Sequence, residues 1–273
     1  MTAIMKSDFF KLKKSRSLKV CMLVAFVLGL LMALLYHLAW NNLKDNMEMT
    51  RSMMMMFGSD EKTISDTLSI IPSDNLWSYV NTALCDTNVL YVAAIVISIF
   101  VGSEYSMGTV KNAVSRGCSH TGLFVSKLLF SMIIMLMTVV AYLAGVMIIG
   151  CILIGFGSEI SAGQILLILT AYLAEFAAIT GIYVMIAVWL KSTGHSIAFS
   201  LIMPMLISSV LQVAALVNSS NDLISHFWIF QTVTATQQLC LYNEGYIPFL
   251  VSAVYLVLSC LGGLLIFRRQ ELK

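Results

Sequence analysis

The chain has 273 residues, of which 59% are hydrophobic and only 11% are charged, and its formal net charge is +2. Soluble domains usually carry about 25% charged residues, so this composition excludes an ordinary soluble protein and predicts an all-α integral membrane protein. Six apolar blocks are long enough to cross a ~30 Å hydrocarbon core as helices of roughly 20 residues. We place these spans at residues 18–40, 83–101, 122–156, 165–190, 196–217 and 247–267, within a single transmembrane domain of residues 1–273.

The segment before the first span predicts an amphipathic helix at the membrane interface over residues 3–17. Met5, Phe9 and Leu12 recur at i, i+4 and i+7, with lysines interleaved between them. A plain cluster of positive charge that sets topology would also account for the lysines, and the two interpretations are compatible.

The distribution of Lys and Arg predicts the orientation of the spans. Thirteen of the sixteen cations fall in the segments that would share one side of the membrane: Lys6, Lys11, Lys13, Lys14, Arg16, Lys19, Lys111, Arg116, Lys127, Lys191, Arg268, Arg269 and Lys273. We therefore expect both termini to be cytoplasmic.

Residues 41–80 are predicted to form the first outer loop, which is acidic and rich in methionine, with four consecutive Met residues at 53–56. Thioether sulfur is a soft ligand that suits Cu(I). However, four consecutive residues spread around a helix instead of converging on an ion. We therefore favour a helix resting on the bilayer and predict no metal site.

A polar segment over residues 104–121 separates the second and third spans. Gly108 and Thr109 are suited to break or cap the chain, which predicts a short helix over residues 110–117 at the membrane surface. Lys111 and Arg116 would then offer charge to another protein. The alternative is a solvated loop that only sets topology.

The amino-acid pattern of this segment resembles that of a known family. Glu-Tyr-x-x-Gly-Thr-x-Lys-Asn from Glu104, then Ser-Arg-Gly and Lys127, resembles the cytoplasmic coupling loop of type 2 ABC exporter permeases, in particular the lantibiotic-immunity and bacitracin-resistance group. The specific likeness covers about residues 103–127, and the six-span layout matches more loosely. His120 departs from the Arg that many relatives carry. The resemblance implies that the ATPase-docking residues are Glu104, Gly108, Thr109, Val110, Lys111, Asn112 and Arg116.

The resemblance also implies a role and a set of partners. The chain would be a non-catalytic permease subunit in a bacterial plasma membrane, assembled with a second permease and with a separate ATPase that binds ATP and Mg²⁺. It would export a substrate such as an antimicrobial peptide or a drug. The sequence itself contains no G-x-x-x-x-G-K-[ST] phosphate-binding motif, and we expect no cofactor in this chain and no nucleic-acid partner. Peptide, drug, lipid-linked molecule and ion all stay open as substrates, as do homodimer and heterodimer.

Glu175 is the acid that we place deep within a span, the fourth. A carboxylate at that depth is costly unless it is paired, neutralised or facing water, so it is a candidate for the transport path. A hydrogen-bonded structural role is the alternative. The rival to the exporter is a stand-alone secondary transporter or channel that uses Glu175 for ion or proton coupling, although the chain lacks the duplicated halves common in that class. A membrane enzyme is disfavoured because the sequence contains no catalytic motif such as the G-x-S-x-G nucleophile elbow.

Three further features concern the outer side and the packing of the spans. Residues 218–246 predict a second outer segment containing a short interfacial or re-entrant helix.

Cys85 and Cys240 both fall near the outer surface, where a disulfide can persist, but the sequence does not say whether they approach each other. Gly181 predicts a close contact between helices.

Overall fold

A computed structural model describes residues 2–56, 75–155, 157, 161–217, 227–241 and 245–269, and every regular element in these ranges is a helix. Six helices of this described part are long and apolar enough to cross a membrane. They are α2 (Arg16–Asp45), α6 (Thr87–Ser106), α8 (His120–Leu153), α9 (Ala162–Leu190), α10 (Thr193–Val217) and α13 (Tyr246–Arg269). The predicted all-α multi-pass membrane fold is confirmed.

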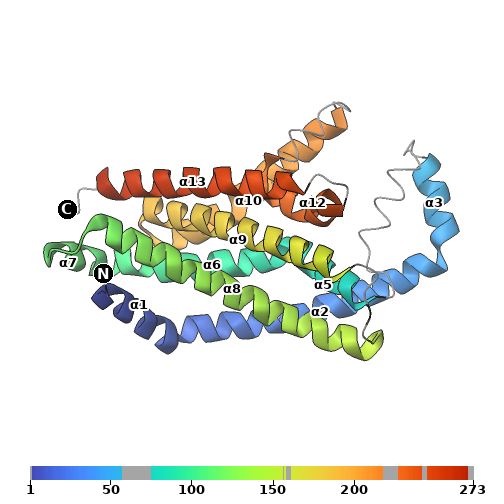
Figure 1. The fold of residues 1–273 in the computed structure, drawn as a ribbon, viewed down its shortest axis with the longest axis horizontal. Helices are drawn as coiled ribbons and strands as arrows, with labels where there is room; N and C mark the ends of the chain where they lie inside the picture. Colours follow the sequence, from blue (N-terminus) through green and yellow to red (C-terminus); the bar gives the residue numbers. More distant parts are fainter. Residues whose placement is uncertain are drawn as a thin grey trace.

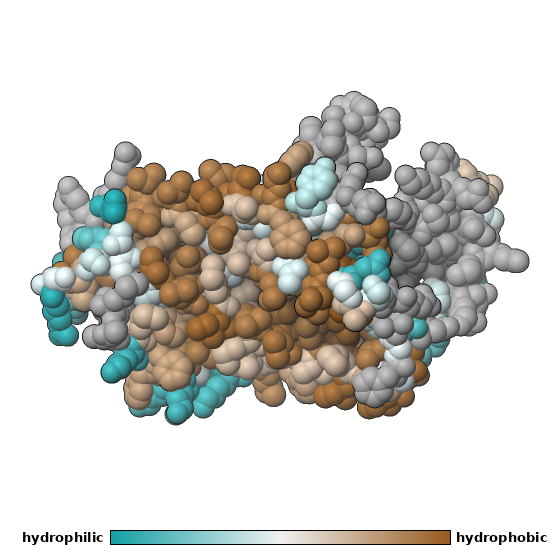
Figure 2. All heavy atoms as spheres, viewed as in Figure 1, coloured by the Kyte–Doolittle hydropathy of each residue, from teal (hydrophilic) through white to brown (hydrophobic). Residues whose placement is uncertain are grey.

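Helices α2, α6, α8, α9 and α13 lie side by side along the longest axis of the molecule, whereas the C-terminal part of α10 points away from them (Figure 1). Helix α9 packs along α13 and also contacts α6, α8 and α10, while α2 packs along α8. The side of this bundle that Figure 2 shows is covered by hydrophobic residues over most of its length, and hydrophilic residues lie at the two ends and along part of one edge. A wide apolar surface of this kind is what the hydrocarbon of a bilayer requires.

The shorter helices divide between the two ends of the bundle. Helices α1 (Thr2–Lys14) and α7 (Thr109–Ser115) lie at the same end as the last turn of α13, whereas α3 (Met47–Met56), α5 (Leu76–Cys85) and α12 (Ile229–Leu241) lie toward the other (Figure 1). We call the first the α7 end. Both ends of the described chain therefore lie at the α7 end, as an even number of spans requires.

The predicted second span, 83–101, was misplaced because it merged parts of two helices. Helix α5 ends at Cys85 and α6 begins at Thr87, with Asp86 as the N-cap whose Oδ1 accepts a hydrogen bond of 3.0 Å from the Asn88 amide. A carboxylate satisfies and stabilises the positive end of a helix, so a single residue breaks an otherwise apolar run. Helix α6 then continues to Ser106, which places Glu104 inside its last turn.

The predicted outer segments are partly described. Helix α3 is the helix expected in the methionine-rich loop, and residues 57–74 lie outside the described residues. In the second segment, residues 218–226 and 242–244 also lie outside the described residues, while α12 packs against α9 and α13 and buries Thr232 and Thr236. Helix α12 is therefore an integral part of the packed bundle.

Two helix pairs approach closely at glycines. A Cβ on Gly29 of α2 would lie 2.2 Å from the carbonyl oxygen of Tyr142 on α8, and one on Gly145 would lie 2.4 Å from the carbonyl oxygen of Phe26. The predicted contact at Gly181 is confirmed, since a Cβ there would lie 2.3 Å from Ser259 Oγ on α13. Small residues let transmembrane helices gain van der Waals contact that larger side chains would prevent.

Candidate functional site

Helix α7 is a short helix of about two turns that begins shortly after α6 ends. Gly108 supplies the left-handed backbone conformation needed at this corner, with φ of +66°, and serves as the N-cap of α7. The Thr109 hydroxyl donates a hydrogen bond of 3.0 Å to the Glu104 carbonyl oxygen. The corner at Gly108 and Thr109 and the short helix after it, both predicted from sequence, are present.

The two faces of α7 differ in character. Val110 is buried and belongs to the hydrophobic core of the bundle. Lys111, Asn112 and Arg116 are exposed. Helix α7 thus presents a cationic face outward while its inner face is fixed by packing.

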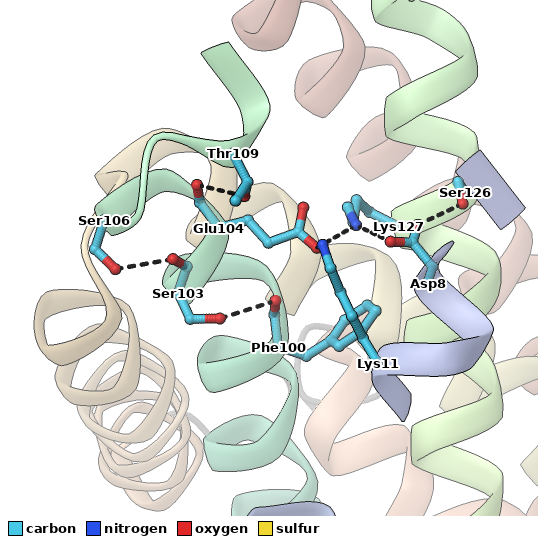
Figure 3. A network of polar contacts seen from close by, with 9 residues as sticks. All are labelled: Asp8, Lys11, Phe100, Ser103, Glu104, Ser106, Thr109, Ser126 and Lys127. Atoms are coloured by element: carbon cyan, nitrogen blue, oxygen red, sulfur yellow. Dashed lines mark hydrogen bonds and ion pairs between the residues drawn. The ribbon is translucent and has the colours of Figure 1, made fainter. Parts of the chain in front are cut away.

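An ion-pair network lies directly beneath α7 (Figure 3). The ammonium of Lys127 on α8 lies 2.6 Å from Asp8 Oδ1 on α1 and 2.6 Å from Glu104 Oε1 on α6. Lys11 of α1 adds a second ammonium at 2.8 Å from the same Glu104 oxygen. The Ser126 hydroxyl donates to Asp8 Oδ2 at 2.7 Å. We refer to Asp8, Lys11, Glu104 and Lys127 as the buried network.

The network balances its charges in a largely buried place. Asp8, Lys127 and Glu104 are only 2%, 4% and 5% exposed, and the ring of Phe100 lies 5.1 Å from the Lys127 ammonium. Two carboxylates face two ammonium groups, of which Lys127 is buried and Lys11 lies at the exposed edge, so the network as a whole carries no net charge. Because an unpaired charge in such a site is very costly, the network holds α1, α6 and α8 together at the α7 end.

A groove of about 430 Å³ lies between α1 and α7. Ser7 lines it from α1, Asn112 and Arg116 line it from α7, and Glu104 and Lys127 also contribute to its walls. A displacement of α7 relative to α1 would therefore change the surroundings of the buried network.

The structure divides the residues that were expected to dock a partner. Lys111, Asn112 and Arg116 are exposed and available for contact, but Glu104 and Val110 are buried. The expectation that Glu104 itself meets a docked protein is corrected here, since its carboxylate is already bonded to Lys11 and Lys127. Glu104 supports α7 from below.

Sequence reasoning missed Asp8 and Lys11 as members of the site. It also grouped Leu12 with Met5 and Phe9, whereas Leu12 is buried against the protein and Phe9 is exposed. Asp8 is the one acid among the first forty residues, which otherwise carry six cations. That isolated acid was the available signal, but only the fold identifies its partner 119 positions away.

Glu175 is fully buried in α9, where its Oε1 accepts a hydrogen bond of 2.7 Å from the Thr236 hydroxyl on α12. Its second oxygen has no hydrogen-bond partner within the described residues. Nearby in α9, the Tyr172 hydroxyl donates to Asn81 Oδ1 at 3.1 Å and lies 3.0 Å from the Cys85 sulfur. This second polar cluster is well separated along the bundle from the buried network, because α5 and α12 lie toward the other end (Figure 1).

The candidate disulfide is not formed in this structure. Cys85 and Cys240 are both free, and the Cys85 sulfur contacts Tyr172 and the Thr234 carbonyl oxygen instead. Burial raises the pKa of the Cys85 thiol to about 11. Because the thiolate is the reactive form, Cys85 is poorly reactive at neutral pH.

Comparison with known proteins assigns the chain to a family. The model of DUF2705, described as a protein of unknown function, matches residues 49–272. The chain belongs to the DUF2705 family. No curated protein and no solved structure matches the chain. The part shared with DUF2705 includes Glu104, α7 and Lys127, whereas Asp8 and Lys11 precede it.

Proposed function

We propose that this chain is the membrane-spanning permease subunit of an ATP-driven exporter, and that α7 docks a separate ATPase. The observation that carries the proposal is the construction of α7: an outward cationic face set on a buried, charge-balanced support. An exposed loop that only sets topology has no need of such a support. The resemblance of residues 103–127 to exporter coupling loops favours the same conclusion.

The contacts at the α7 end suggest how force would pass into the membrane. Lys111 and Arg116 would pair with acidic groups on the ATPase, which binds the ATP and Mg²⁺. Movement of α7 would reach α6 through the bond between Thr109 and Glu104, and would reach α1 and α8 through the buried network. A second permease copy or paralogue completes the assembly in this proposal. In this proposal the assembly lies in a bacterial plasma membrane with both termini cytoplasmic, and it exports a substrate such as an antimicrobial peptide or a drug.

Site-specific crosslinking tests the docking directly. A photo-crosslinking residue at Asn112, which is exposed on α7, should capture an ATPase in native membranes, whereas one at Val110 would be buried. The matched control is Met56, which is 89% exposed and lies at the opposite end of the bundle. Mass spectrometry of the adduct identifies the captured protein. Capture at Met56 but not at Asn112 would contradict the proposed docking surface.

Charge reversal on α7 tests whether docking drives export. An exposed ion pair contributes only ~0–1 kcal/mol, so alanine at Lys111 or Arg116 alone should weaken coupling modestly. Lys111→Glu with Arg116→Glu adds repulsion and should abolish export while leaving folding intact, because both side chains are exposed. The control is Lys191→Glu, which reverses an exposed cation outside α7. Lys191 lies two residues before Thr193, and Thr193 packs beside Gly102 of α6. Export that survives the double reversal would count against α7 as the coupling element.

The rival function, a secondary transporter, rests on Glu175 and its unpartnered buried oxygen. Glu175→Gln keeps an oxygen for Thr236 and removes the ionisable group, so we expect the yield of folded protein to be retained and transport to fall. Transport should be followed across a pH series in vesicles, with and without ATP. Transport driven by an ion gradient without ATP would establish the rival. Transport unchanged by the substitution at every pH would leave Glu175 a purely structural role.

A further inference from the structure

A second groove, of about 340 Å³, adjoins the groove between α1 and α7 and shares Lys11, Glu104 and Thr109 with it. One wall is the end of α1 and the start of α2, and the other is α6. Its apolar lining includes Leu12, Leu18, Val96, Ile99 and Phe100. Along α6 the lining runs from Val96 to Glu104, which is about 12 Å at the helical rise of 1.5 Å per residue. The groove is therefore long and mostly apolar.

The charged residues that line this groove carry a net positive charge. Lys11 and Lys14 line it, and the acid in its lining, Glu104, is already paired with Lys127 and Lys11. The Lys11 side chain is 42% exposed. The Lys14 ammonium lies 5.7 Å from the Phe10 ring and has no ion-pair partner within the described residues. The mouth of the groove thus offers two ammonium groups to an anion.

The groove lies where α1 gives way to the first candidate transmembrane helix. Helix α1 exposes Phe9 and Phe10, as an interfacial helix would, and the first transmembrane helix starts immediately afterwards at Arg16. An occupant must therefore combine a negative headgroup with a long apolar chain. A free phosphate would leave the apolar wall uncovered, and a zwitterionic lipid would bring its own ammonium group next to Lys14 and Lys11, which would repel it.

We propose that this groove binds one anionic phospholipid, with an acyl chain along α6 and its phosphate at Lys14 and Lys11. Basic pockets between helices at the cytoplasmic surface are a recurring means of recognising acidic headgroups. Because Lys11 also bonds Glu104, a phosphate at the groove would share this ammonium with the buried network. Lipid composition would then influence the support of α7. This proposal stands independently of any ATPase.

Native mass spectrometry of the purified full chain titrated with phosphatidylglycerol or phosphatidylcholine tests the proposal. We expect preferential retention of phosphatidylglycerol. Lys14→Gln should weaken that binding about fivefold, the factor expected for one basic residue at a membrane surface. The matched control is Lys13→Gln, an exposed neighbour on the same helix that does not line the groove, and it should leave binding unchanged.

A second variant tests the apolar part without altering charge. Ser103 lines the groove and is not fully buried, so Ser103→Leu should fill part of the space and weaken retention of phosphatidylglycerol. Equal losses in Lys14→Gln and Lys13→Gln would overturn the proposal in favour of diffuse attraction to a basic helix. Equal retention of the two lipids by the unaltered protein would overturn it as well.

Discussion

Lys127→Ala should be among the most damaging single substitutions in this protein. The change leaves Asp8 and Glu104 facing each other in a buried site, with only the partly exposed Lys11 to compensate for two carboxylates. Removing one member of a buried ion pair typically costs about 3–5 kcal/mol. We expect a large fall in apparent melting temperature and in the yield of monodisperse protein, measured by fluorescence-detected size exclusion in detergent.

Two matched variants separate the loss of charge balance from the loss of a side chain. Lys11→Ala removes an ammonium from the exposed edge of the network and should cost only ~1 kcal/mol or less, because solvent screens that pair. Asp8→Asn, Glu104→Gln and Lys127→Met together remove the buried charges and should recover part of the stability, since no unpaired charge then stays buried. Equal melting temperatures for Lys127→Ala and Lys11→Ala would show that the network does not hold the helices together.

Gly29→Ala should also be strongly destabilising, for a steric reason. The new Cβ would lie 2.2 Å from the Tyr142 carbonyl oxygen, a backbone atom that no rotamer change can move aside. Helices α2 and α8 would have to separate, and overpacking of this kind typically costs about 1–3 kcal/mol or more. Separation would also strain the hydrogen bonds from Tyr36 and Tyr142 to Asp86 Oδ2, which are 2.9 Å and 2.5 Å long.

The glycines of the chain provide a graded series for this prediction. Gly181→Ala would place its Cβ 2.3 Å from Ser259 Oγ, a side-chain atom that can rotate away, so its effect should be smaller. Gly163→Ala meets no atom within 4 Å and should be neutral or slightly stabilising, because alanine favours the helix. The apparent melting temperature should therefore be highest for Gly163→Ala, intermediate for Gly181→Ala and lowest for Gly29→Ala. A reversed order would mean that close approach of α2 and α8 is not a determinant of stability.

Local properties of the chain predicted much of the fold. Long apolar blocks cannot leave the bilayer without exposing hydrocarbon to water, so the spans were visible from hydropathy alone. The corner before α7 was also visible, because glycine adopts a positive φ without strain and Gly108 does so here. The predicted second span began before α6 does, because one capping acid, Asp86, divides a run that hydropathy treats as continuous.

The candidate site depended far more on tertiary structure. The sequence by itself determined an all-α membrane protein with six spans and a short helix between the second and third. Only the packed bundle decided that Lys127 meets Asp8, and that Glu104 lies beneath α7 instead of facing a partner. The same holds for Glu175 and Thr236, 61 positions apart. Hydropathy and capping act over a few residues, whereas the pairing of buried polar groups depends on how each span is rotated against its neighbours.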